Sequence, residues 1–296
     1  MKAFVTGSTG FLGHGTVSAL LESGHKARCM VRIKSQSKTP QGGGIEKFVV
    51  DYVNSGRLAQ GVKGCDVVFN LSGIIREFPK SHTTFQAVHV DFTRDLLEAC
   101  KIAGVKRYLH MSALGVDSGL DVGYNNSKLA AEKLVRESGL DWTIFRPSLI
   151  FGPGDRFAVE FAGWMKTRRP IPVIGKGDYR LMPVGRTDLC RGMVKLIDFK
   201  DSFGQIYNIG GAQTLNYMEI LDIIEKAASA NKMVIKMPAG SIMFIAGILG
   251  RFKSFPATKD MIKMLLKESV TAETKFWEHT GISPQKLEDG LPEYLV

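Results

Sequence analysis

Apolar residues in the first half of the chain follow two alternating patterns. Short runs rich in β-branched residues are followed by longer stretches with helical spacing, as in a parallel sheet covered by crossover helices. This alternation predicts an α/β fold with a doubly wound parallel sheet. The predicted strands are Lys2–Thr6, Lys26–Val31, Glu46–Val50, Val67–Leu71, Arg107–Ser112 and Trp142–Arg146, and the predicted helices are Phe11–Ser23, a segment around Leu58, Thr84–Ala103 and Ser127–Glu137.

The regular alternation ends after Ile150, where proline and glycine become frequent and the later elements shorten. We expect a helix near Thr187–Asp198 and a strand near Ile206–Ile209 to rejoin the main sheet. The other late segments are expected to form a small C-terminal lobe. The predicted domains are 1–149 with about 182–210 for the sheet, and about 150–181 with 211–296 for the lobe.

Three glycines with GxxGxxG spacing lie where the first predicted strand passes into the first predicted helix. Glycine allows a tight turn and a close approach to a pyrophosphate, whose charge the helix N-terminus would receive. A purely structural turn is the alternative, but the position between strand and helix favours a dinucleotide site on a Rossmann-type fold. The residues expected to bind the cofactor here are Gly7, Thr9, Gly10, Phe11, Leu12 and Gly13.

The end of the second predicted strand indicates which dinucleotide is bound. An acidic residue there would bind the ribose 2′-hydroxyl of NAD, but the chain has Arg32 followed by Lys34. Because cationic side chains suit a 2′-phosphate, we expect NADP(H) rather than NAD(H). The alternative is that Arg32 is an ordinary exposed arginine. Asp51 and Tyr52, after the third predicted strand, are also expected to contact the cofactor, with Asp51 at the adenine amino group.

Two later strand ends are expected to complete the cofactor site. Leu71, Ser72 and Gly73 follow the fourth predicted strand and would lie along the cofactor ribose. Pro147 and Ile150 follow the sixth and would lie near the nicotinamide, with a structural turn as the alternative for this segment.

A serine, a tyrosine and a lysine form the candidate catalytic group. Ser112 ends the fifth predicted strand, and Tyr124 and Lys128 lie one turn apart on one helix face. A tyrosine hydroxyl has a pKa near 10, so it is a poor acid–base group alone. A nearby ammonium and a positive nicotinamide ring would lower that pKa towards neutrality.

Together these motifs resemble the short-chain dehydrogenase/reductase superfamily, in its extended or atypical branch of NAD(P)-dependent epimerase/dehydratase-like proteins. The stretch His110–Gly115 with the nearby tyrosine and lysine resembles the subgroup related to the accessory NAD(P)H-binding subunit of respiratory complex I. His89 departs from the pattern, since relatives often have asparagine there. The motifs carrying the resemblance are Thr6–Gly13, Asn70–Gly73, Ser112, Tyr124–Lys128 and Arg146–Asp155.

The resemblance implies an enzyme in which Tyr124 acts as acid–base, Lys128 binds the nicotinamide ribose and tunes Tyr124, and Ser112 orients the reacting oxygen. The expected function is an NADP(H)-dependent oxidoreductase or a nucleotide-sugar epimerase-like enzyme, with hydride transfer at an alcohol or ketone carbon. Tyr124 follows Ser112 by only twelve positions, which argues against a large nucleotide-sugar substrate. The alternative function is a non-catalytic NAD(P)H-binding scaffold, or a redox-sensing or assembly protein.

Charge and composition restrict the partners. The net charge of +10 favours an anionic partner. Because the sequence contains no run of five like charges, a phosphorylated or nucleotide-linked small molecule fits better than nucleic acid. Four cysteines without a CxxC pair suit the reducing cytoplasm, and the histidine spacings suggest no metal site. The apolar segment Pro238–Phe255 is expected to be a packed helix, with a membrane-surface or partner-docking helix as the less favoured alternative.

Overall fold

The computed structural model describes residues 1–50, 53–249 and 258–295. The chain divides into two compact units. The boundaries lie at 146, 188 and 208, close to the predicted 149, 182 and 210, and residues 275–282 return to the first unit, which the sequence did not predict. The first unit comprises 1–146, 189–208 and 275–282, and the second 147–188, 209–274 and 283–296.

A seven-stranded sheet forms the centre of the first unit, which is an α/β Rossmann-type fold as predicted. Strands β1 to β6 pair in parallel, and β11 lies beside β6 at one edge, in the order β11-β6-β5-β4-β1-β2-β3. The strands are β1 (Lys2–Thr6), β2 (Lys26–Arg32), β3 (Ile45–Val50), β4 (Val67–Asn70), β5 (Arg107–Met111), β6 (Asp141–Pro147) and β11 (Gln205–Ile209).

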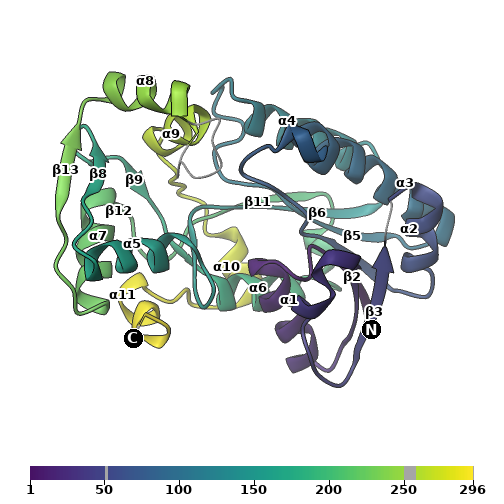
Figure 1. Ribbon diagram of the computed structural model, residues 1–296. Coiled ribbons are helices and arrows are strands. Elements are labelled where there is room, and N and C mark those ends of the chain that lie inside the picture. The colour runs from purple at the N-terminus through teal and green to yellow at the C-terminus, as the bar shows by residue number, and fades with distance from the viewer. Residues whose placement is uncertain (51–52, 250–257, 296) are drawn as a thin grey trace. The chain divides into compact units, whose positions relative to one another are not determined.

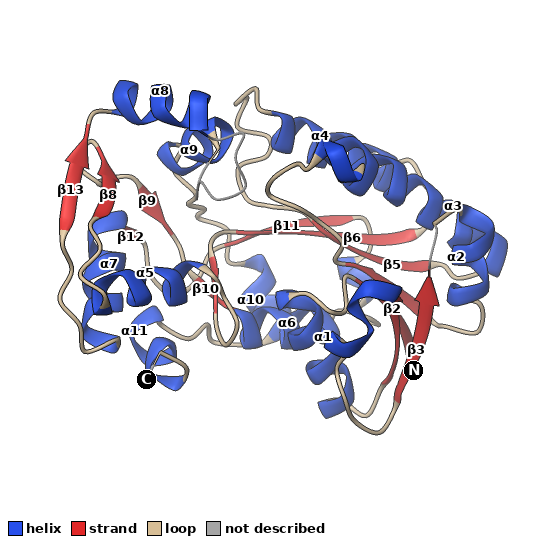
Figure 2. Ribbon diagram, viewed as in Figure 1, coloured by secondary structure: helices blue, strands red, loops and turns tan. Residues whose placement is uncertain are grey.

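Helices cover both faces of this sheet (Figures 1 and 2). On one face α1 lies against α6, where the Thr16 hydroxyl donates to Cys190 Sγ over 3.5 Å. On the other face α2, α3 and α4 lie in turn, with α3 between its two neighbours (Figure 1). The helices of this unit are α1 (Phe11–Glu22), α2 (Ser55–Val62), α3 (Phe92–Ala103), α4 (Gly123–Arg136), α6 (Arg186–Lys195, whose first turn is assigned to the second unit) and α10 (Lys275–Thr280).

The core of the first unit lies between the sheet and these helices. Phe4, Phe69 and Tyr108 point from β1, β4 and β5 and are fully buried. All four residues of β4 are buried as well. Because apolar residues occupy both faces of the central strands, helices must cover both faces, as the sequence pattern predicted.

The structure changes three predicted segments. The helix predicted from Ser127 begins at Gly123, so Tyr124 lies inside its first turn. The helix predicted for Thr84–Ala103 contains a π-helical segment at Gln86–Asp91 before α3. The polar, glycine-rich stretch Ser35–Gly44 predicts a surface loop, but its first residues belong to a 3₁₀ helix, Ile33–Lys38.

The second unit has short strands and separate helices. Its strands form three two-stranded sheets, β7 with β10, β8 with β13 and β9 with β12. Aromatic rings form part of its core, including Phe161, which packs edge-on against Trp164 and Tyr217. The strands are β7 (Ile150–Phe151), β8 (Ile171–Ile174), β9 (Arg180–Leu181), β10 (Val184–Gly185), β12 (Leu215–Asn216) and β13 (Val234–Met237), and the helices are α5 (Phe157–Lys166), α7 (Tyr217–Ala227), α8 (Ala239–Leu249), α9 (Lys259–Leu266) and α11 (Leu287–Gly290).

Helix α8 coincides with the start of the apolar segment noted in the sequence. Ala246 is buried, Ile242 and Met243 pack against the core of the unit, and Phe244 is 71% exposed. Residues 250–257 of the same segment lie outside the described part of the chain. Across the residues that were described, no helix is both long and apolar enough to span a bilayer.

Candidate functional site

The glycine loop between β1 and α1 is closed by backbone contacts that exclude side chains. Gly7 has a φ of +64°, and a β-carbon there would lie 2.8 Å from the carbonyl oxygen of Leu71. A β-carbon on Gly13 would lie 2.2 Å from the carbonyl oxygen of Gly7, and the Gly10 amide donates to that same oxygen over 2.9 Å. Helix α1 begins at Phe11 without a side-chain cap. The loop is therefore a backbone cradle at a helix N-terminus, which fits a pyrophosphate.

This cradle lies where the strand order reverses. Strands β2 and β3 lie on one side of β1, and β4 to β6 lie on the other. Ligands of open α/β sheets bind outside the carboxyl ends of the strands at such a point. Buried side chains fix the three strand ends here, since the Ser8 hydroxyl donates to Met30 O and the Thr6 hydroxyl to Asn70 Oδ1.

The cationic end of β2 is open to solvent. Arg32 is the last residue of β2, Lys34 follows in the 3₁₀ helix, and both are exposed. Within the described chain neither side chain has a hydrogen bond or an ion pair, so both can meet an anion. His14 Nε2 lies 3.0 Å from Lys38 O, which ties this segment to α1. Asp51 and Tyr52, also predicted to bind the cofactor, lie outside the described residues.

Hydrogen bonds of the Asn70 side chain hold the loop after β4 in place. This buried side chain donates from Nδ2 to Thr93 Oγ1 and to the Tyr108 hydroxyl, while its Oδ1 accepts weakly from the amide of Ser72. Leu71 lies beside the glycine cradle. A β-carbon on Gly73 would lie 3.4 Å from Lys128 Nζ. The loop Leu71–Gly73 is thus in contact with both the cradle and α4.

Helix α4 presents three ionisable residues at four-residue intervals to the interior. Tyr124, Lys128 and Glu132 lie on one face and are buried, as this spacing requires. Lys128 Nζ donates to Met111 O over 2.9 Å, and the Ser112 hydroxyl donates to Glu132 Oε1 over 2.5 Å. The structure therefore brings the predicted Ser112, Tyr124 and Lys128 to one place.

A buried ion pair lies next to this group. Arg146 at the end of β6 binds both oxygens of Glu132, from Nε over 2.8 Å and from Nη2 over 2.6 Å. Its Nη1 also pairs with Asp117. The Ser112 hydroxyl hydrogen points to Glu132, so towards a ligand Ser112 offers its oxygen as an acceptor. Sequence reasoning missed Glu132, although its place four residues after Lys128 could have indicated it.

Burial shifts the pKa values of the tyrosine and the lysine in opposite directions. It raises the pKa of Tyr124 to about 12 and lowers that of Lys128 to about 8, against a smaller opposing effect of the Glu132 charge on Lys128. The expectation that Lys128 lowers the pKa of Tyr124 is therefore not met in the protein alone, because desolvation dominates. The lysine is poised near neutrality instead.

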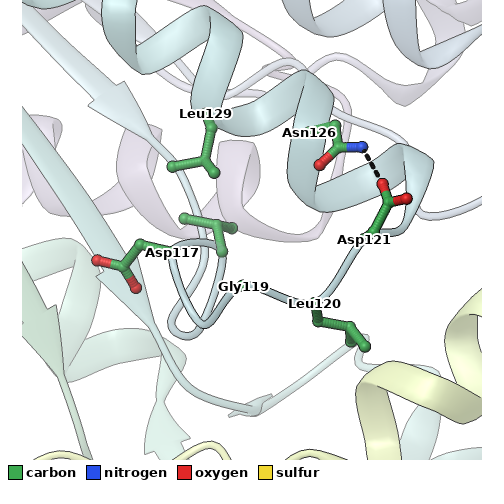
Figure 3. Close-up of a pocket in the computed structure, with 7 residues that line it drawn as sticks. Asp117, Gly119, Leu120, Asp121, Asn126 and Leu129 are labelled. Carbon is green, nitrogen blue, oxygen red and sulfur yellow. Dashed lines mark hydrogen bonds between the residues drawn. The ribbon is translucent and has the colours of Figure 1, made fainter.

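A pocket opens beside α4, between the helix and the loop that follows Ser112 (Figure 3). Its walls include the apolar side chains of Val116, Leu120 and Leu129. Asn126 Nδ2 donates to Asp121 Oδ1 over 2.7 Å at its rim. The pocket borders the loop that carries Asp117, but Tyr124 does not line it.

A family model described as NAD(P)H-binding matches residues 7–160, just over half of the chain. This range begins at the first glycine of the cradle and includes Ser112, Tyr124 and Lys128. The chain belongs to this NAD(P)H-binding family. The predicted membership of the extended short-chain dehydrogenase/reductase superfamily, near the complex I subunit subgroup, is confirmed.

Members of very different function resemble this NAD(P)H-binding chain. The mitochondrial NADH-ubiquinone oxidoreductase 40 kDa subunit of Neurospora crassa is 23% identical, over 99% of this chain and 78% of the relative. A ketoreductase of a farnesylated quinoline oxide from Stigmatella aurantiaca is 26% identical, over 83% of this chain and 77% of the relative. The family thus includes enzymes as well as complex I subunits.

Solved structures share the fold. An epimerase of Methanothermobacter thermautotrophicus superposes with a TM-score of 0.80 at 19% identity, covering 98% of this chain and 89% of that one. MoeE5, in complex with UDP-glucose and NAD, superposes with a TM-score of 0.77 at 19% identity, covering 100% and 97%. At this identity the likeness concerns the fold, and the family assignment carries the nicotinamide cofactor.

Two predicted cofactor residues fall in the other unit of the NAD(P)H-binding protein. Pro147 is the last residue of β6 and the first of the second unit, and Ile150 begins β7, which pairs with β10 there. Their role at the nicotinamide stays a prediction. In the described ranges, histidine, cysteine, aspartate and glutamate side chains form no group of three that could hold a metal ion.

Proposed function

We propose that the protein is an NADP(H)-dependent oxidoreductase that acts at an alcohol or ketone carbon. The observation that carries the proposal is the position of α4, whose Lys128 lies 3.4 Å from where a Gly73 β-carbon would be, with Tyr124 on the same helix face. A helix that only covered the sheet would not need a buried, unpaired lysine charge beside a cofactor loop. Burying that charge destabilises the fold, and a catalytic role explains why the lysine is there.

The residues divide the proton chemistry among them. When bound, NADP(H) supplies or accepts the hydride. In the direction of reduction the Tyr124 hydroxyl gives its proton to the carbonyl oxygen, and the Lys128 ammonium stabilises the resulting phenolate. Ser112, whose hydrogen is held by Glu132, accepts a hydrogen bond from the hydroxyl of the alcohol.

Arg32 and Lys34 support the phosphorylated cofactor. Both are exposed at the carboxyl end of β2, where the adenosine ribose of a dinucleotide lies in this fold. A guanidinium binds a phosphate through two parallel hydrogen bonds, which a ribose hydroxyl cannot reciprocate. We therefore propose NADP(H) in preference to NAD(H).

The proposal is tested by identifying the nucleotide that co-purifies with the protein and by screening carbonyl and nucleotide-sugar substrates. We expect NADPH-dependent turnover of a carbonyl substrate by wild type, and its loss in Tyr124→Phe. Isomerisation of a nucleotide sugar without net consumption of NADPH would identify an epimerase instead. Turnover that survives unchanged in Tyr124→Phe would overturn the acid–base assignment.

A non-catalytic NAD(P)H-binding scaffold is the second candidate. The similarity to complex I subunits over nearly the whole chain favours it. In a scaffold the bound nucleotide would stabilise the fold by linkage, without turnover of any substrate. A rise in Tm with NADPH that is equal in wild type and Tyr124→Phe, together with no turnover across the substrate screen, would favour the scaffold.

We further propose that the protein works in a reducing compartment such as the cytoplasm. All four cysteines are buried thiols, and burial raises the pKa of Cys29 to about 11 and that of Cys100 to about 12. Thiols of this kind remain protonated and unreactive. Fractionation of the native host cells with an antibody against the protein tests the location, and enrichment in mitochondria would contradict the cytoplasm.

A further inference from the structure

His89 lies in the π-helical segment Gln86–Asp91, and its side chain is only 2% exposed. Both ring nitrogens have polar partners. The backbone amide of Ile74, next to Gly73, donates to Nε2 over 3.1 Å, and Nδ1 lies 2.8 Å from the Ser127 hydroxyl oxygen. π-Helical segments are rare in proteins, and those that occur often lie at functional sites.

These partners determine where the ring proton is. An amide N–H can only donate, so Nε2 must be the unprotonated acceptor and Nδ1 must carry the hydrogen. The Nδ1–H then donates to Ser127, whose own hydroxyl donates to the carbonyl oxygen of Tyr124 over 2.8 Å. A directed chain of three hydrogen bonds therefore runs from Ile74 through His89 and Ser127 to the backbone of Tyr124.

The surroundings of the ring keep it neutral. Burial and the charge of Lys128 lower the pKa of His89 to about 3. Tyr124 and Lys128 are the titratable groups of α4 near the ring, and His110 is a third group nearby. His110 is also buried and has its pKa well below the usual value, through burial and the Lys128 charge. No carboxylate contributes to the shift of either histidine.

The same ring fixes the Tyr124 side chain by packing. His89 meets Tyr124 edge to face, with centroids 5.6 Å apart and planes at 88°. Phe85 stacks on the imidazole at 5.5 Å and meets the Tyr124 ring at 5.9 Å and 81°. Hydrogen bonds to the backbone and ring contacts thus act on the same tyrosine. The imidazole of His89 also lies beside the loop Leu71–Gly73 after β4, since a β-carbon on Gly73 would be 3.7 Å from Nε2.

We infer that His89 is a positioning residue, which in its neutral Nδ1–H form joins the cofactor loop after β4 to the helix that carries Tyr124. It sets the distance between Gly73 and Tyr124 and takes no part in proton transfer. Its effect on turnover rests on the proposed function, whereas its protonation state and its hydrogen bonds do not. An asparagine at this place could not span the same two partners, because its side chain is shorter than an imidazole by about one bond length.

The first test is independent of any activity. Nitrogen NMR on wild-type protein with 15N-labelled histidine distinguishes the tautomers. We expect one ring with a protonated Nδ1 and an unprotonated Nε2 whose signals do not change between pH 5 and pH 8, and its absence from the spectrum of His89→Phe assigns it. A protonated Nε2, or titration of this ring between pH 5 and 8, would overturn the inference.

The second test compares two matched substitutions in the full chain. His89→Phe keeps a ring to stack on Phe85 but removes both hydrogen bonds. His25→Phe is the control, because the His25 ring lies beside the N-terminal amino group, where β1 and β2 begin. Hydrogen exchange of the Ile74 amide should become at least about tenfold faster in His89→Phe and remain unchanged in the control. An unchanged exchange rate in folded His89→Phe would contradict the hydrogen bond.

The third test separates positioning from proton transfer. Ser127→Ala removes the two hydrogen bonds of the Ser127 hydroxyl, to His89 Nδ1 and to the Tyr124 carbonyl oxygen, and leaves the Ile74 bond in place. It therefore also serves as a test if His89→Phe does not fold. We expect each variant to lower kcat by about 10- to 100-fold, the double variant to be no worse than the more damaged single variant, and the pH profile to keep its shape. Additive losses, or the disappearance of an inflection from the pH profile, would contradict positioning.

The failure of this inference can be told from failure of the proposed function. If no substrate is turned over by wild type, the oxidoreductase assignment fails, and the NMR and exchange results still decide the role of His89. If wild type is active while the tautomer is wrong or Ile74 exchange is unchanged, the inference fails and the oxidoreductase remains.

Discussion

The loop Gly7–Gly13 and the inner face of α4 contact the same loop after β4, but the first does so mainly with backbone atoms and the second with side chains. The loop is almost entirely backbone, and its shape depends on the absence of β-carbons at Gly7 and Gly13. The face of α4 is built from buried charged and polar side chains that come from α4 itself, from β6 and from Ser112, which directly follows β5. The first region needs only a local sequence pattern, and the second needs partners that the fold brings together.

This difference should appear as a difference in stability. Glu132 is fully buried and binds Arg146 through both carboxylate oxygens, so its removal leaves the buried guanidinium with the mainly exposed Asp117 carboxylate as its ion-pair partner. We expect Glu132→Ala to lower the free energy of unfolding by about 3–5 kcal/mol, as measured by urea denaturation.

The control for Glu132 lies at the C-terminal cap of the same helix. Glu137 is 63% exposed and lies 3.9 Å from Lys133, so Glu137→Ala should change the free energy of unfolding by no more than about 0.5 kcal/mol. A loss below about 1 kcal/mol in Glu132→Ala would mean that the buried pair does not hold the α4 face together.

The next largest effect concerns the buried charge of Lys128. Its pKa is about 8 in the folded protein against 10.5 ordinarily, so between these values the unfolded chain binds the extra proton. Stability from this group therefore rises with pH across that window, by about 3 kcal/mol in all. We expect the free energy of unfolding of wild type, relative to Lys128→Met, to increase by that order from pH 8 to 10.5. A flat difference would show that the lysine is not desolvated.

Sequence patterns predict the glycine loop but only part of the α4 face, and the reason is physical. Strand β1 begins and ends at the predicted residues, because a buried strand followed by glycines is a local signal. Helix α4 begins four residues before its predicted start, since Val122 at its N-cap provides no side-chain cap that a sequence could reveal. Glu132 and Arg146 are 14 residues apart in sequence, and only the pairing of β6 with β5 brings them together.

The second unit shows the same limit more strongly. Its strands have two to four residues, too short for an alternation to be read, and they pair across long stretches of sequence, as β8 does with β13. The return of residues 275–282 to the first unit carries no local signal either. Tertiary context outweighs local preference in such segments.

The smallest effect sharpens the cofactor assignment. Arg32→Asp should weaken NADPH binding by about tenfold or more while changing NADH binding much less, because it replaces the cation proposed to bind the 2′-phosphate with an anion. Arg94→Asp makes the same charge change on α3 and should alter neither. Titration of each variant with both nucleotides measures this, and equal weakening of NADPH and NADH binding would defeat the NADP(H) preference.

The most direct test of the account measures NADPH binding and turnover on the same two variants. Gly13→Ala should weaken NADPH binding by about 100-fold and lose turnover with it, because its β-carbon would collide with the backbone of Gly7 and Ser8. Gly163→Ala, with open space around it, is its control. Tyr124→Phe should bind NADPH like wild type and lower kcat by about 100-fold or more, while Tyr207→Phe stays active. Turnover that persists in Tyr124→Phe, or binding that persists in Gly13→Ala, would contradict the division between a backbone cradle that binds and a side-chain cluster that catalyses.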